Sequence, residues 1–128
     1  MTEVFDRAIA DHVTLYLPPP ISVNAMYRSF AMGKRLATIK SQKYRDWIRE
    51  AGDMLEAQKP ACVPGYYAIG IAVPAKTRVD IGNVEKAVSD LLQTHNVIEN
   101  DRLCERIEIW RGAEDRMLVS IRKFERVA

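Results

Sequence analysis

The stretch "VDIGNVEKAVSDLLQTHNVIEND", residues 79–101, combines a helical pattern with a group of acids. Val84, Val88, Leu91 and Leu92 recur at i, i+4, i+7 and i+8, which is the spacing of one buried helix face. The pattern predicts a helix over 83–95. Strand-like segments lie on both sides of it, so the stretch indicates a domain that mixes strands and helices.

Polar side chains of this stretch are expected to converge on one point. Asn83, Lys86 and Asp90 stand at i, i+3 and i+7, opposite the apolar stripe. Acids also flank the helix: Asp80, Glu99 and Asp101. Oxygen ligands of this kind suit Mg²⁺, which takes a few carboxylates, retained waters and phosphate oxygens. Beside a scissile phosphate, Lys86 would stabilise developing negative charge.

A purely structural interpretation explains the same residues. In it Asp80 caps the helix, and Lys86 and Asp90 form an exposed i, i+4 pair worth about a few tenths of a kcal/mol. Glu99 and Asp101 would then simply face water in a turn. Spacing alone leaves both interpretations open.

The remaining sequence predicts one α+β domain with a mixed sheet and the approximate order β-α-β-α-β-β. A strand over 13–17 is stopped by three prolines, and residues 21–40 are expected to form a mobile basic loop. Ser41 is the expected N-cap of a helix that ends before Pro60. Further strands are expected over 66–75, 104–110 and 116–124, with Gly112 in a hairpin loop between the last two.

Composition bounds the class of protein. The chain has 128 residues, of which 48% are hydrophobic and 28% charged, as in an ordinary single globular domain. We expect a flexible lead-in over 1–11 and the folded domain over 12–128. The two cysteines have no metal-ligand spacing, and no segment reaches the ~20 apolar residues of a membrane helix. We therefore expect a cytoplasmic protein with free thiols and no membrane partner.

Positive charge is concentrated in one region, although the formal net charge is only +2. Residues 28–49 contain seven Lys or Arg and a single acid, Asp46. Such a local excess suits a polyanion, because each cation that meets a phosphate releases a condensed counterion. A solvated basic helix face is the alternative.

Two motifs together resemble the RusA family of Holliday junction resolvases. Residues 79–101 are similar to its pattern D-x-D-N-x-x-K-x-x-x-D followed about ten residues later by an acidic pair. The matching positions are Asp80, Asn83, Lys86, Asp90 and Asp101. Upstream, "LPPPISVNAMYR" resembles the family's early segment, here with Ser22, Asn24, Tyr27 and Arg28. The resemblance covers most of the chain from Val13 onward.

The resemblance implies a homodimeric, Mg²⁺-dependent endonuclease, typically encoded by phages or prophages, that nicks two strands of a four-way DNA junction symmetrically. Mn²⁺ is expected to replace Mg²⁺, and no organic cofactor is expected. By position, Asp80 and Asp101 would be metal-binding catalytic carboxylates, Lys86 an essential cation and Asp90 a supporting acid. The expected DNA contacts are Asn24, Tyr27, Arg28, Lys34, Arg35, Lys40 and Asn83.

The sequence departs from the family pattern at two positions. Gly82 stands where the family has its second Asp, and Asn100 replaces the first member of the closing acidic pair. Glu85 or Glu99 would restore the metal ligand that glycine lacks. Weaker binding of a more hydrated metal is a second explanation. The third is a non-catalytic protein that binds junction DNA on the same scaffold.

Overall fold

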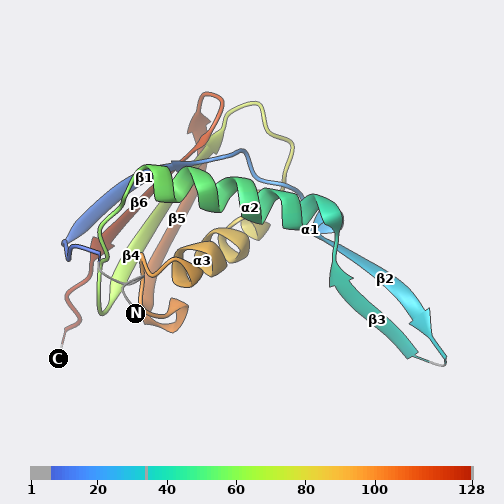
Figure 1. The fold of residues 1–128 in the computed structure, drawn as a ribbon. Coiled ribbons are helices and arrows are strands. Elements are labelled where there is room, and N and C mark those ends of the chain that lie inside the picture. Colours follow the sequence, from blue (N-terminus) through green and yellow to red (C-terminus); the bar gives the residue numbers. More distant parts are fainter. Residues whose placement is uncertain (1–6, 34, 128) are drawn as a thin grey trace.

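The computed structural model describes residues 7–33 and 35–127. Two α-helices of substantial length and a mixed sheet form the body (Figure 1). The strands are β1 (His12–Leu17), β2 (Tyr27–Met32), β3 (Arg35–Lys40), β4 (Tyr67–Pro74), β5 (Cys104–Ala113) and β6 (Met117–Lys123). The α-helices are α1 (Val23–Met26), α2 (Gln42–Ala57) and α3 (Glu85–Thr94), with short 3₁₀ helices η2 (Ile81–Asn83) and η3 (Asp101–Leu103).

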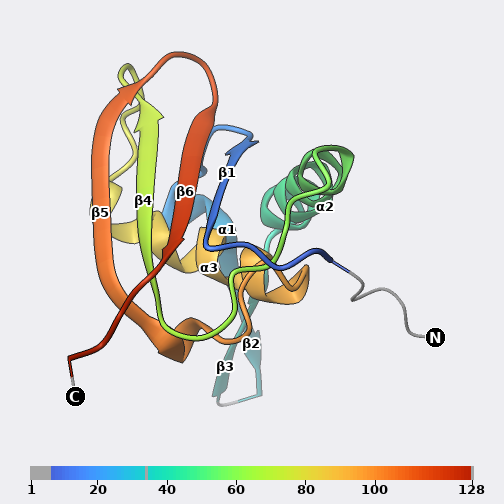
Figure 2. The same cartoon turned by 90° about the vertical axis from the view of Figure 1, so that its left-hand side faces the viewer.

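The main sheet has four strands in the order β1-β6-β4-β5. β4 and β5 are parallel, whereas β6 runs antiparallel to both β1 and β4. Both long helices cover the same face of this sheet, and none of the described helices lies over the other face (Figure 2). The expected α+β class with a mixed sheet is confirmed.

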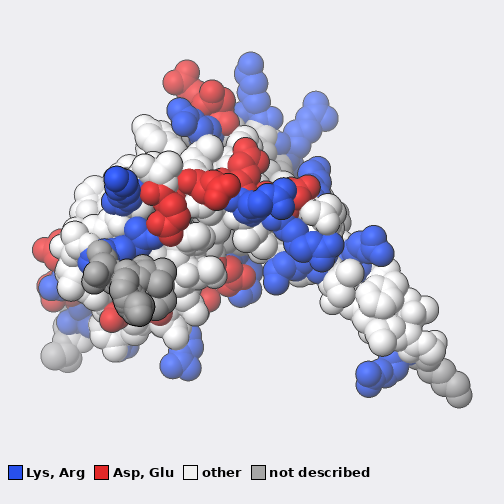
Figure 3. All heavy atoms as spheres, viewed as in Figure 1, with Lys and Arg blue, Asp and Glu red and all other residues white. Residues whose placement is uncertain are grey.

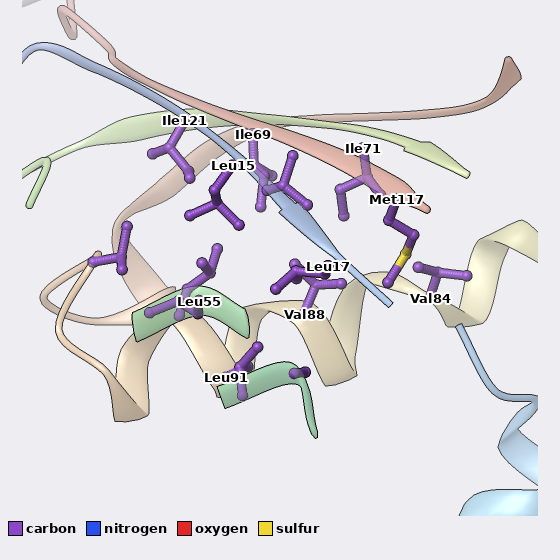
Figure 4. Close-up of a cluster of buried hydrophobic side chains, with 14 of the residues drawn as sticks. Leu15, Leu17, Leu55, Ile69, Ile71, Val84, Val88, Leu91, Met117 and Ile121 are labelled. Carbon is purple, nitrogen blue, oxygen red and sulfur yellow. The ribbon is translucent and has the colours of Figure 1, made fainter. Parts of the chain in front are cut away.

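The core lies between the sheet and the two helices (Figure 4). β1 alternates exposed and buried residues along its whole length, which is the period-2 pattern of a strand with one covered face. On α3 the apolar stripe predicted from spacing is buried at Val88, Leu91 and Leu92. These helix residues pack with buried residues of three strands, including Leu15, Leu17, Ile69, Ile71, Met117 and Ile121.

The start of α2 agrees with the sequence prediction. Ser41 Oγ accepts a hydrogen bond from the Tyr44 main-chain N–H at 3.0 Å, so Ser41 is the N-cap. The helix ends at Ala57, before Pro60. Trp47 on its buried face donates from Nε1 to the Pro19 carbonyl at 2.9 Å and fixes the proline run against the helix.

The prediction of a mobile basic loop over 21–40 is wrong. Ser22 caps the one-turn helix α1, and β2 and β3 then form a two-stranded antiparallel arm that projects from the body (Figure 1). Gly33, with φ of 62°, supplies the left-handed backbone conformation where β2 gives way to β3. Nearly all residues of the arm are exposed, so no alternation between buried and exposed positions marked its strands in the sequence.

The prediction that the last two strands form a hairpin is also wrong. β5 and β6 are consecutive in the chain but not paired, because β4 lies between them and bonds to both. Such an arrangement depends on long-range pairing that the local turn sequence does not encode. The predicted helix over 83–95 begins at Glu85, since residues 81–83 form η2 instead.

The segment before β1 contacts the body where the structure describes it. Ala10 and Cys62 pair through the hydrogen bond from Ala10 N–H to the Cys62 carbonyl at 2.9 Å. The Arg7 guanidinium donates to the carbonyl of His95 at 2.8 Å and to Glu56 Oε2 at 2.6 Å. Residues 1–6 of the expected lead-in lie outside the described residues.

Two expectations from composition concern the cysteines and membrane-spanning helices. Cys62 and Cys104 are free cysteines, as expected. Within residues 7–33 and 35–127, no helix is long and apolar enough to cross a membrane.

Candidate active site

The loop after β4 places Asp80 and Gly82 at the start of α3. Asp80 Oδ1 accepts a hydrogen bond from the Gly82 main-chain N–H at 3.0 Å and caps η2. The carboxylate is exposed and keeps lone pairs for a further ligand. A Cβ built on Gly82 would meet only Asp80 Oδ1, at 3.4 Å. Position 82 therefore has room for a side chain.

Lys86 and Asp90 form an ion pair along one side of α3. Lys86 Nζ donates to Asp90 Oδ1 at 2.9 Å. This hydrogen bond and the charge of Asp90 raise the pKa of Lys86, and the charge of Asp101 acts in the same direction. The lysine is thus a protonated group with acids from two segments around it.

Asp101 returns beside α3 through η3. Its main-chain N–H donates to Gln93 Oε1 at 2.8 Å, which joins η3 to the helix. The preceding Asn100 caps η3, because its Oδ1 accepts from the Arg102 main-chain N–H at 2.9 Å. The side-chain amide oxygen of Asn100 therefore has a structural role as the N-cap of η3.

The two glutamates expected to replace the missing acid differ in their contacts. Glu99 Oε1 accepts from the Gly65 main-chain N–H at 2.8 Å, so it is engaged by the turn before β4. Glu85 lies on the first turn of α3 and accepts a hydrogen bond from Ser89 Oγ. Its charge also acts on the Tyr67 hydroxyl together with that of Asp101. The charges of Glu85 and Asp101 therefore both raise the pKa of the Tyr67 hydroxyl, whereas Glu99 is bound by the turn before β4.

Tyr67 is the residue of this region that sequence reasoning missed. Its side chain is fully buried at the start of β4, and its hydroxyl has no hydrogen-bond partner among the described residues. Burial is the main reason that the pKa of the Tyr67 hydroxyl is raised. The neighbouring Cys104 thiol and then the charges of Asp101 and Glu85 raise it further. The hydroxyl is thus a neutral donor held near two acids. Its place in a strand-like run favours a core residue.

A cavity of about 370 Å³ lies between α2 and α3, with Tyr44, Asp90 and Gln93 in its wall. Lys40 at the end of β3 also lines it. Burial raises the pKa of Tyr44 to about 12, with smaller contributions from Tyr27 and Asp90. The Tyr27 and Tyr44 rings meet edge to face, with centroids 5.7 Å apart. The base of the arm and the acidic side of α3 therefore share one cavity.

The predicted DNA-contacting residues are mostly on the arm. Tyr27, Arg28, Arg35 and Lys40 are exposed there, and Asn83 is exposed on η2. Lys and Arg side chains gather where the arm leaves the body (Figure 3). Lys34 lies outside the described residues. Asn24 is on α1, and its side chain is likewise outside the description.

The donor set fits a divalent cation that has few protein ligands. The exposed Asp80 carboxylate at the start of α3 and the half-buried Asp101 carboxylate in η3 are the hard oxygen donors that Mg²⁺ takes, with water and phosphate completing its shell. Among the described residues, no three or more His, Cys, Asp and Glu side chains gather closely enough to hold a metal. An ion here would therefore depend on one or two carboxylates and on phosphate oxygens.

Comparison with known families gives one result. The family model for the endodeoxyribonuclease RusA matches residues 17–122. The match spans the proline run, the arm, α2 and every acid described above. No curated protein matches the chain.

Proposed function

The chain belongs to the RusA family of endodeoxyribonucleases, which are hydrolases that cut DNA, and from this premise we propose that it resolves four-way DNA junctions. The match over residues 17–122 carries the proposal, because it contains both the acids beside α3 and the basic arm. The proposed product is a pair of symmetric nicks, as recombination and repair require. A phage or prophage origin is part of the same proposal.

Asp80 and Asp101 are the proposed ligands of Mg²⁺, with Mn²⁺ as a substitute. A bound divalent ion polarises a phosphodiester and lowers the pKa of water. The two carboxylates flank α3 in the chain, since Asp80 precedes η2 and Asp101 begins η3. Gln93 positions the Asp101 backbone through the 2.8 Å hydrogen bond to its N–H.

Lys86 is proposed to stabilise the charge that develops on the phosphate. Its ion pair with Asp90, at 2.9 Å, holds the ammonium on the side of α3 that carries the acids. A preorganised cation is effective because it need not reorient during the reaction. Asp90 thus acts through Lys86 as a positioning residue.

Glu85 is the proposed replacement for the acid that Gly82 lacks. It lies three residues further along the chain, on the first turn of α3, and its charge reaches the same hydroxyl as that of Asp101. Ser89 orients it by donating to Oε2. Glu99 is less suited, because the Gly65 N–H already binds its carboxylate at 2.8 Å.

The arm is proposed to contact the DNA backbone. Its residues 27–40 include Arg28, Lys34, Arg35 and Lys40 and no acid. Contacts of Lys and Arg with phosphates position DNA without reading its sequence. Lys40 also lines the cavity beside Asp90, so DNA bound along the arm would pass close to the acids. Asn24, Tyr27 and Asn83 are the further proposed contacts.

A homodimer is proposed because a four-way junction presents two equivalent scissile phosphates, and a two-fold dimer presents two equivalent sites. A second function has two observations in its favour. Position 82 has no side chain, and the described residues include no three-ligand metal group. A protein with this scaffold would then bind junctions without cutting them.

Cleavage of a labelled synthetic four-way junction separates the two functions. The protein is incubated with Mg²⁺, Mn²⁺ or chelator beside Asp80→Asn and Asp101→Asn, and binding is followed by gel shift. The nuclease proposal predicts metal-dependent nicks that both variants lose while they still bind DNA. Tight binding without nicks in either metal supports the second function instead.

A further inference from the structure

The segment between β4 and η2, residues 75–80, carries Asp80 at its end and contains no helix or strand. Its start is tied to the main sheet, since the Ala75 main-chain N–H donates to the Ala113 carbonyl at 2.9 Å. At its end the Asp80 carbonyl accepts from the Asn83 main-chain N–H at 3.1 Å, within the turn of η2. The exposed Asp80 carboxylate therefore depends on how the middle of the segment is held.

Arg111 of β5 holds the middle of this segment from outside. Its Nη2 donates to the Val79 carbonyl at 2.9 Å, and its Nε donates to the Thr77 carbonyl at a longer 3.4 Å. The guanidinium is a planar, rigid fork, so one side chain fixes two carbonyls relative to each other. The shorter bond goes to Val79, which directly precedes Asp80. Arg111 therefore ties the neighbour of the proposed metal ligand to the main sheet.

Arg111 occupies a position of β5 where the pattern of the strand favours an apolar residue. Residues 107, 109 and 111 pair in register with three buried residues of β4: Ile69, Ile71 and Val73. Aligned side chains of paired strands point to the same face, here the face that the helices cover. The first two of the three β5 residues are isoleucines, whereas the third is Arg111. An apolar residue would continue this face but could not bind the segment before η2.

An irregularity of β5 follows Arg111. The register with β4 shifts there, and Gly112 is the extra residue between two paired positions. Such a bulge bends a strand and redirects the side chains next to it. A Cβ on Gly112 would lie 3.1 Å from Cδ1 of Trp110, so a larger residue would require the indole to move. The bend in β5 thus lies next to the residue that binds the segment.

Within residues 7–33 and 35–127, Arg111 forms no ion pair. Both of its hydrogen bonds go to main-chain carbonyls of the segment that carries Asp80. Its guanidinium is nevertheless exposed and could instead serve as a DNA contact. A role in placing Asp80 and a role in binding phosphate predict different effects of removing the side chain.

We propose that Arg111 is a positioning residue that fixes Asp80 for the divalent cation by holding residues 77–79. The inference rests on the proposed function, because it takes Asp80 as a metal ligand. A ligand that is already in place binds an ion more tightly, since less chain must be ordered on binding. This support has added weight here, because Gly82 supplies no second carboxylate beside Asp80. Loss of such an outer support typically weakens metal binding about 10–100-fold.

Binding of Mn²⁺ to the DNA-free protein tests this role without any cleavage. Mn²⁺ is paramagnetic and broadens the NMR signals of nearby amides, and the Gly82 amide donates to Asp80 Oδ1 at 3.0 Å. Arg111→Met should raise the Mn²⁺ concentration that half-broadens the Gly82 signal about tenfold. Arg111→Lys keeps the charge but not the fork, and its midpoint should lie between the two. Arg106→Met is the matched control on the same strand and should keep the original midpoint, because Arg106 bonds only Glu108, at 3.1 Å.

Hydrogen exchange of the Gly82 amide reports the hold on the segment directly. Arg111→Met should speed this exchange, because the segment opens more often when its carbonyls lose their donors. Circular dichroism and melting temperatures check that all variants fold. A purely structural arginine would lower the melting temperature and leave the Mn²⁺ midpoint unchanged at temperatures well below melting. Should Arg111→Met not fold, Arg111→Lys alone decides, and an unchanged midpoint in it would overturn the inference.

Gel shifts with junction DNA in chelator, over a range of salt concentrations, separate positioning from DNA contact. A lost phosphate contact would reduce the salt slope of binding by about one, whereas we expect Arg111→Met to keep the original slope. A reduced slope with an unchanged Mn²⁺ midpoint would make Arg111 a DNA contact and overturn its positioning role.

Failure of this inference is distinct from failure of the proposed function. Equal Mn²⁺ midpoints and equal exchange in the original protein and Arg111→Met would overturn the role of Arg111 and leave Asp80 as a ligand. An original protein whose Gly82 signal does not broaden at any Mn²⁺ concentration would overturn the metal site itself, and the role of Arg111 with it.

Discussion

Lys86 Nζ donates to Asp90 Oδ1 at 2.9 Å, one turn further along α3. As an exposed i, i+4 pair, it contributes only about 0.3–0.5 kcal/mol to stability. Its proposed value lies in catalysis, since Asp90 both raises the pKa of Lys86 and directs its ammonium.

Lys86→Met should therefore reduce the single-turnover cleavage rate of a junction by about 10²–10³-fold, the usual cost of losing one group that stabilises developing charge. Asp90→Asn should reduce it less, because the ammonium remains but is less well held. Both variants should bind junctions and unfold within a few degrees of the original protein. A lysine variant that cuts at the original rate would remove Lys86 from the mechanism.

Gly82→Asp should increase cleavage at limiting Mg²⁺. The position is exposed, and a Cβ there meets only Asp80 Oδ1, at 3.4 Å, so the side chain enters without a steric clash. An added carboxylate supplies a further oxygen ligand and should shift the Mg²⁺ dependence of the rate to lower concentration. Gly82→Ala is the matched control, because it adds the Cβ without the carboxylate. Equal behaviour of the two variants would contradict a metal site at Asp80.

Glu85→Gln and Glu99→Gln form a second matched pair. Glu85→Gln should raise the Mg²⁺ concentration needed for half-maximal cleavage, because a neutral amide is a weaker ligand than a carboxylate. Glu99→Gln should leave that concentration unchanged and lower stability by about 1 kcal/mol, since it weakens the charged hydrogen bond to Gly65. Titrations with metal and thermal unfolding measure the two effects. If Glu99→Gln raised the Mg²⁺ requirement and Glu85→Gln did not, Glu99 would be the replacement ligand.

Glu56 should make the protein sensitive to acid. Burial opposes its ionisation, but hydrogen bonds from His95 and Arg7 and their charges outweigh burial and hold its pKa below the ordinary 4.5. A carboxyl with a lowered pKa in the folded state stabilises the protein above its unfolded pKa, and this contribution is lost as pH falls through the folded value.

The melting temperature should therefore fall as pH drops below about 4.5, and Glu56→Gln should flatten this part of the profile. Glu50→Gln, an exposed residue of the same helix, is the control and should keep the original slope. An unchanged profile in Glu56→Gln would show that the contacts with Arg7 and His95 do not govern stability in acid.

The helices and the buried strands could be predicted from the sequence because their patterns are local. Ser41 is a cap that acts over three residues, and the Val88–Leu92 stripe repeats within α3. The arm was not predicted, because its exposed strands show no alternation. The insertion of β4 between β5 and β6 was also missed, since it depends on pairing between segments far apart in sequence.

The candidate site could likewise be predicted only in part from the sequence. Motif spacing identified Asp80, Lys86 and Asp90 because these lie within eleven consecutive residues. The buried hydroxyl of Tyr67 became apparent only in three dimensions, where β4 brings it near Asp101 and Glu85. Spacing also left Glu85 and Glu99 equivalent, whereas the hydrogen bond from Gly65 to Glu99 distinguishes them.

We propose that this chain cuts both strands of a junction although Gly82 stands where the family has an acid. This cleavage is tested on a supercoiled plasmid that extrudes a cruciform, treated with the protein in Mg²⁺ and, in parallel, in chelator. Paired nicks convert the plasmid to linear DNA with ends at the base of the cruciform, and we predict this product only in Mg²⁺. Intact plasmid with protein bound to the cruciform would show that the chain is not a nuclease but a junction-binding protein on a nuclease scaffold.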